Sequence, residues 1–115
     1  MTVEQPAVID LVAHNPERDE ATLAMVEHRE WSDRGALLPD LQAKLNTYLA
    51  YVTEGQLWKD FPALQGKPVH IQLFAAAPPT VRELEFLRLA SEQHLRPEGI
   101  RLSWRLLDDG PEHGV

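Results

Sequence analysis

The residue types best suited to chemistry are grouped in one run, Glu27-His28-Arg29-Glu30-Trp31. Two carboxylates and an imidazole are enough for proton transfer, so an enzyme centred on Glu27, with Arg29, Trp31 and Asn46 around it, is one hypothesis. A Glu–Arg pair at a strand end more often fixes a loop, and a tryptophan beside it more often covers the core. We therefore favour a structural role for this run and assign no catalytic residue.

A structural role has a consequence for Glu27 and Arg29. Both share the parity of Leu23 and Met25, which we expect to face the core. An unpaired charge beside apolar side chains would be costly. We therefore expect the two residues to be partly buried and hydrogen-bonded to each other or to the loop that carries Trp31.

The remaining polar residues match no catalytic or ligand-binding motif. The five histidines, His70 among them, lack the spacing of a metal site, and we assign them to the surface or the hairpin. The serines lack a Gly-x-Ser-x-Gly setting, the glycines form no phosphate-binding loop, and there is no cysteine. The sequence therefore predicts neither a metal nor a cofactor.

Length and composition favour a small single-domain protein and argue against a nucleic-acid-binding or membrane protein. The chain has 115 residues, a length that is enough for one domain and hardly more, and its net charge is −7. The acidic balance opposes binding to nucleic acid or anionic lipid, and no apolar run approaches the length of about 20 residues that a membrane helix needs. The first residues lack signal-peptide features. We expect a cytoplasmic protein with one α/β domain over residues 1–107 and a disordered acidic tail over residues 108–115.

Hydrophobic periodicity predicts four strands and two helices that must position these residues. Their order, β-β-α-β-α-β, predicts an α/β two-layer sandwich with a four-stranded mixed sheet and both helices on one face. The predicted elements are strands at 7–13 and 21–27, a helix from about residue 37, a strand at 69–75, a helix from about residue 80 and a strand at 100–106.

The two helices have different boundary signals. The apolar stripe of the first leaves open whether it ends at Gly55 or continues through Trp58. Thr80 and Glu83 have the spacing of a capping box at the start of the second, and Val81 falls on or near its core face.

Parity divides the predicted sheet into a helix-facing side and an open side. The hairpin half of the open side is apolar, whereas the other two strands add polar and basic groups. An apolar patch with a polar rim is typical of an interaction surface, although valine and alanine also occur on solvated strands. The candidate binding residues are Val8, Val12, Ala24, Val26 and Phe74 on this side, with Glu27, Arg29 and Trp31 at its end.

Several segments resemble a family of small bacterial proteins filed as a domain of unknown function. The resemblance covers about residues 8 to 107 and implies a stand-alone cytoplasmic domain, with no activity, ligand or catalytic residue attached to it. It is carried by Ile9-Asp10-Leu11-Val12, Met25-Val26-Glu27-x-Arg29-x-Trp31, Lys44-Leu45-Asn46-Thr47-Tyr48-Leu49, Gly55-Gln56-Leu57 and Gly66-Lys67-Pro68-Val69.

Three functions remain open from the sequence. The first is a non-enzymatic binding or assembly module, a homodimer through its open sheet face or an edge strand, in which Val26→Lys should break the dimer. The second is an acidic inhibitor or immunity-type protein whose protein partner is a basic toxin or nuclease, because complementary charge speeds association. The third is the enzyme centred on Glu27. We favour the first.

Overall fold

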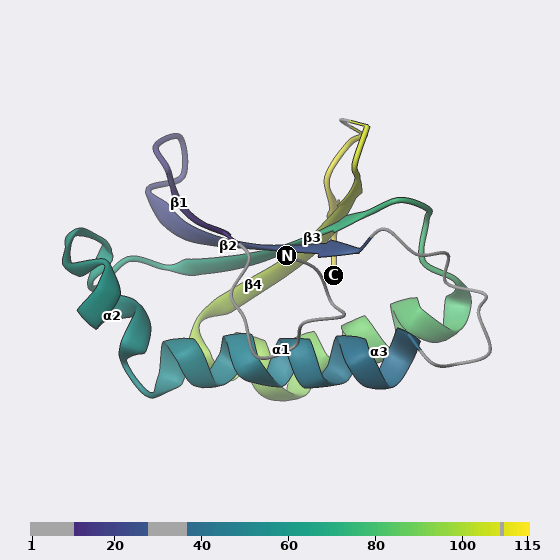
Figure 1. The fold of residues 1–115 in the computed structure, drawn as a ribbon, viewed down its shortest axis with the longest axis horizontal. Helices are drawn as coiled ribbons and strands as arrows, with labels where there is room; N and C mark the ends of the chain where they lie inside the picture. The colour runs from purple at the N-terminus through teal and green to yellow at the C-terminus, as the bar shows by residue number, and fades with distance from the viewer. Residues whose placement is uncertain (1–10, 28–36, 109) are drawn as a thin grey trace.

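One sheet lies against a layer of helices in the computed structural model, which describes residues 11–27, 37–108 and 110–115 (Figure 1). The strands are β1 (Leu11–Asn15), β2 (Glu20–Glu27), β3 (Val69–Ala75), β4 (Ile100–Leu106) and β5 (His113–Gly114). The helices are α1 (Leu37–Thr53), α2 (Gln56–Asp60) and α3 (Val81–Ala90), the last continued by a π-helical turn (Ser91–Leu95) and a 3-10 turn (Arg96–Glu98).

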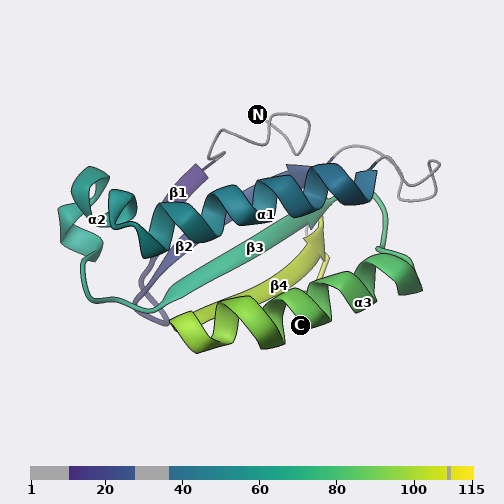
Figure 2. The ribbon, with the colours of Figure 1, turned by 90° about the horizontal axis from the view of Figure 1, so that it is seen from below.

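The strands lie side by side in chain order, β1-β2-β3-β4-β5. The outer pairs β1/β2 and β4/β5 are antiparallel, whereas β2/β3 and β3/β4 are parallel. Parallel neighbours need crossover connections, and α1 and α3 supply them on the same face of the sheet (Figures 1 and 2). The predicted α/β class is confirmed.

The predicted number of strands is wrong. A fifth strand, β5, pairs with β4 through Ser103 and Trp104. It lies within residues 108–115, which we expected to form a disordered tail outside the domain. A two-residue strand carries no hydrophobic pattern of its own, so periodicity could not predict it.

The core lies between the helices and one face of the sheet. Alternate residues of β2, β3 and β4 point into it, as predicted from their parity. Helix α1 contributes its predicted stripe of apolar side chains to the core. The Tyr48 hydroxyl on this helix donates a hydrogen bond of 2.5 Å to the Ala24 carbonyl of β2. The fully buried members with the largest side chains include Leu23, Met25, Leu41, Tyr48, Leu57, Ile71, Leu73, Leu87, Leu95 and Ile100.

The predicted parity of β1 is wrong. Val12 pairs with Leu23 and packs against the core, so it does not belong to the open face. Leu11 and Ala13 take the opposite side, and Leu11 is 58% exposed. The register of a hairpin is set by its turn, and the turn before β2 includes Asp19 with a positive φ of 49°. A shift of one residue exchanges the two faces of the strand.

The ends of the helices follow local chemistry. Gly55 has a φ of 84°, so α1 ends at Thr53 and the separate short helix α2 carries Trp58. Thr80 is the N-cap of α3, but its hydroxyl donates to the Glu83 carboxylate and makes no cap hydrogen bond to the helix backbone, so the predicted capping box is not formed. Val81 is 84% exposed and not on the core face, because the buried side of α3 runs through Glu83 and Leu87.

Candidate functional site

The run that carried the catalytic hypothesis is only partly described. Arg29 and Trp31, like Val8 of the predicted patch, lie outside the described residues. Glu27 ends β2 and is buried, with 1% of its surface exposed, whereas its predicted bond to Arg29 or to the loop of Trp31 stays a prediction. Asn46 is exposed on α1 and lines a hollow between α1 and α3, away from the sheet face opposite the helices. Glu27 is therefore buried at the end of a strand, whereas Asn46 is exposed beside a hollow between two helices.

A second hollow lies on the open face of the sheet. The turn between β1 and β2 and the segment between β4 and β5 both rise from the sheet on the side opposite the helices (Figure 1). A cavity of about 310 Å³ lies on this face. Its lining residues are Leu11, Ala13, His14, Asn15, Thr22, Ala24, His70, Gln72, Phe74, Arg105 and Glu112. We call this cavity the open-face hollow.

One side of the open-face hollow is apolar. Of the patch predicted from the sequence, Ala24 and Phe74 line it, and Val26 lies on the same strand face, half-buried. Val12 is replaced there by Leu11 and Ala13 because of the shifted register of β1.

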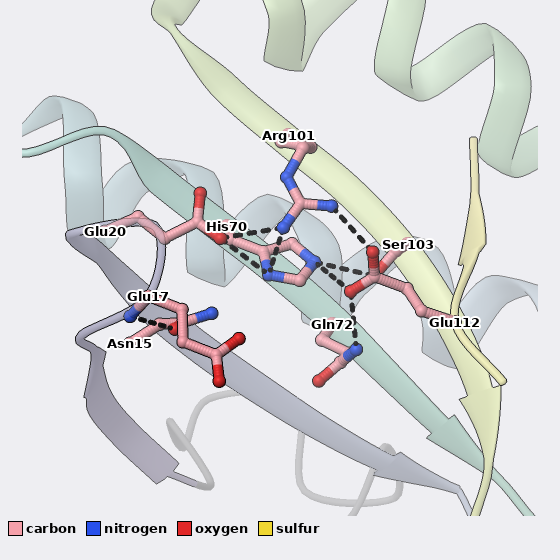
Figure 3. A network of polar contacts seen from close by, with 8 residues as sticks. All are labelled: Asn15, Glu17, Glu20, His70, Gln72, Arg101, Ser103 and Glu112. Carbon is pink, nitrogen blue, oxygen red and sulfur yellow. Dashed lines mark hydrogen bonds and ion pairs between the residues drawn. The ribbon is translucent and has the colours of Figure 1, made fainter. Parts of the chain in front are cut away.

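The other side of the open-face hollow is bounded by hydrogen-bonded polar side chains centred on Arg101 (Figure 3). The Arg101 Nη2 donates to Glu20 Oε1 at 2.7 Å and to His70 Nδ1 at 3.0 Å, and its Nη1 donates to Glu112 Oε2 at 3.0 Å. Gln72 Nε2 donates to the second oxygen of Glu112 at 3.1 Å. Three strands and the segment before β5 thus meet at one guanidinium group.

His70 lies in the middle of this polar network. It is paired with Thr22 on β2 and with Arg101 on β4, and it is buried beside Ser103, whose Oγ is 2.6 Å from its Nε2. Because a guanidinium group can only donate, His70 Nδ1 must accept from Arg101 and the ring proton must lie on Nε2, facing Ser103. Burial lowers the pKa of His70 below its usual value of 6.5, and the Arg101 charge lowers it further against the opposing effect of Glu20 and Glu112. The ring is therefore neutral near pH 7.

The order Ser103, His70 and Glu20 resembles the nucleophile, base and acid of a hydrolase triad, with Glu20 Oε1 3.4 Å from His70 Nδ1. Two features argue against that chemistry. Ser103 is fully buried, so a substrate could not reach its hydroxyl, and Arg101 occupies the His70 nitrogen that the acid would have to orient. The network is thus built to hold side chains in place.

The sequence interpretation missed this network. His70 was assigned to the surface or the hairpin, yet it is 2% exposed. A signal was present, since His70 and Gln72 on β3 and Arg101 and Ser103 on β4 share the open-face parity, and parallel register brings them side by side. What parity could not show is that Glu112 would fold back over them.

A lowered histidine pKa makes stability depend on pH. The unfolded chain binds the His70 proton more readily, so this contribution is fully present above pH 6.5 and is lost as the pH falls through the folded-state pKa. Between about pH 7 and pH 5 we expect the free energy of unfolding to fall by up to about 1.4 kcal/mol per unit of pKa lowering.

The check is urea unfolding at several pH values of the wild type, of His70→Gln and of His94→Gln, a substitution of an exposed histidine. His70→Gln should flatten the pH dependence in this window, and His94→Gln should retain it. An equal slope in the wild type and His70→Gln would contradict a buried neutral His70.

The sheet order, the two crossover helices and the open-face hollow define a small mixed α/β domain. By the match of a family model over residues 1–108, the chain belongs to DUF6572, a family of unknown function. No curated protein and no solved structure matches it. Within residues 11–27, 37–108 and 110–115, no helix is long and apolar enough to cross a membrane.

Proposed function

We propose that the protein is a non-enzymatic binding module whose ligand occupies the open-face hollow. The observation that carries the proposal is the asymmetry of this cavity, which has an apolar side formed by Leu11, Ala13 and Phe74 and a side of converging polar groups. Concave sites with this division are typical of small-ligand binding, because apolar contacts supply affinity and a few fixed polar groups supply orientation.

The fixed position of the polar groups also supports binding. Glu112 and Gln72 line the hollow and are held by each other, and Arg101 also binds Glu112. Side chains that are already ordered lose little conformational freedom when a ligand arrives, so more of the contact energy appears as affinity.

A tryptophan at position 13 should fill the hollow and abolish binding. Ala13 is exposed on β1 and lines the cavity, and a large aromatic side chain suits a strand. We expect a library of small water-soluble organic fragments, followed by two-dimensional amide NMR, to give hits whose shifts cluster on the hollow of the wild type. Ala13→Trp should lose these shifts, whereas Ala43→Trp, at an exposed site on α1, should keep them.

Two outcomes would oppose this proposal. Hits that cluster in the hollow between α1 and α3 would place the binding surface on the other side of the molecule. Light scattering at twice the chain mass of 13.0 kDa, returned to the monomer mass by Val26→Lys, would instead favour the homodimer. The exposed Leu11 is the feature that supports that second form of the same module.

A further inference from the structure

Resting on the proposed function, we infer that the open-face hollow binds the carboxylate of a small organic acid with an apolar chain, and that Arg105 is the residue that holds the carboxylate. Arg105 lies on β4 opposite Phe74 on β3, and both line the hollow.

The guanidinium group of Arg105 lies over an aromatic ring. Its Cζ lies 6.0 Å from the centre of the Phe74 ring, within the range of a cation–π contact. Among the described residues Arg105 makes no ion pair, and its buried Nε has no hydrogen-bond partner. The ring contact uses none of the N–H donors of Arg105, so the planar group can still bind a carboxylate through two N–H groups.

The charge balance of the hollow points to an anion. Glu112, the lining carboxylate, is bound by Arg101 and Gln72, and the same Arg101 group binds Glu20 at the edge of the network. The two lining imidazoles add no unpaired charge, because His70 is neutral near pH 7 and His14 Nε2 is bonded to Asp19. Arg105 is the charged lining residue that has no charged partner among the described residues, so it contributes positive charge where a ligand would lie.

The apolar side determines the rest of the ligand. Leu11, Ala13 and Ala24 line the hollow together with the Phe74 ring, and none of them offers a side-chain donor or acceptor. An alkyl or aryl chain attached to the carboxylate would cover these side chains and displace water from them. One guanidinium beside an apolar wall suits a singly charged carboxylate better than a phosphate, which usually engages several cationic or backbone donors.

The test uses sodium hexanoate, with hexanamide as its uncharged counterpart and inorganic phosphate as a second anion, followed by amide NMR on the full chain. We expect hexanoate to shift the amides of residues that line the hollow, with a dissociation constant on the order of millimolar for so small a molecule. Hexanamide and phosphate should bind at least about tenfold more weakly, because each lacks one half of the recognition.

Variants of Arg105 separate the contribution of its charge to hexanoate binding from the contribution of the apolar side of the hollow. Arg105→Gln should weaken hexanoate binding about tenfold or more, whereas Arg82→Gln, at an exposed position of α3, should leave it unchanged. Arg105→Lys should restore part of the affinity through charge alone, since an ammonium group lacks the planar fork.

The outcomes distinguish this inference from the proposed function. Equal shifts of the hollow by hexanoate and hexanamide would overturn the role of the carboxylate and leave a binding hollow in place. Hexanoate shifts in the hollow that persist in Arg105→Gln would overturn the role of Arg105. No shift of the hollow with either probe would overturn the inference, and if the fragment hits also avoid the hollow, the proposed function fails with it.

Discussion

Arg101→Ala should lower the free energy of unfolding by about 3 kcal/mol, the low end of the range of about 3–5 kcal/mol for breaking a buried ion pair. The substitution leaves the Glu20 carboxylate, 6% exposed, without the guanidinium that binds it at 2.7 Å. It also removes the hydrogen bonds to His70 and Glu112. The low end applies because the Arg101 side chain is 31% exposed, so water can partly replace it.

Urea unfolding measures this effect, and the chain provides a matched control. Arg88 on α3 also binds two carboxylates, Glu85 at 2.7 Å and Glu92 at 3.0 Å, but all three side chains are exposed. Arg88→Ala should therefore cost far less than Arg101→Ala. Adding Glu20→Gln to Arg101→Ala should recover part of the loss, because it removes the stranded charge. If both arginine variants unfold at the same urea concentration, the network does not stabilise the fold.

Tyr48→Ala should destabilise the fold by about 3–5 kcal/mol, the usual cost of deleting a buried aromatic side chain. Tyr48 is fully buried and joins α1 to β2 through its bond to the Ala24 carbonyl. Tyr48→Phe keeps the ring and removes the hydroxyl, so it should cost about 1–3 kcal/mol, the penalty for leaving a buried acceptor without that donor.

Thermal and urea unfolding of Tyr51→Phe provide the comparison. Tyr51 follows on the same helix and donates to Asp60 Oδ2 at 2.8 Å in an exposed setting, where water replaces the lost bond. Tyr48→Phe should therefore be clearly less stable than Tyr51→Phe. Equal stability of the two variants would show that the hydroxyl of Tyr48 does not help to fasten α1 to the sheet.

Some elements could be predicted from the sequence because their signals are local. Both ends of β3 and β4 agree with the apolar runs at 69–75 and 100–106, which lie after turn residues such as Gly66 and Gly99. The parallel arrangement followed from the crossover helices, whose existence is a matter of helical periodicity.

Other features depend on contacts between distant residues. The register of β1 is set by the conformation of the turn at Asp19, which composition alone does not specify. The candidate site depends on Glu112 folding back onto Arg101 and on the bond between Arg101 and Glu20, 81 residues apart in the sequence. Parity placed Gln72, Phe74 and Arg105 on the right face, but the cavity that they line also needs residues of β1 and β2 and Glu112, which lie far from them in the sequence.

The strand order has a consequence for how the chain folds. Each strand of the sheet pairs with the one that precedes it in the sequence, so no strand has to be inserted between two that are already joined. During synthesis the sheet can grow from the β1 edge, one strand at a time, as the chain leaves the ribosome. The bond from Arg101 to Glu20 closes a loop of 81 residues, so the polar network forms only after β4 has been added. Until then, the Glu20 carboxylate lacks this cation. The polar network therefore stabilises the sheet only after its strands have been added in the order of the sequence.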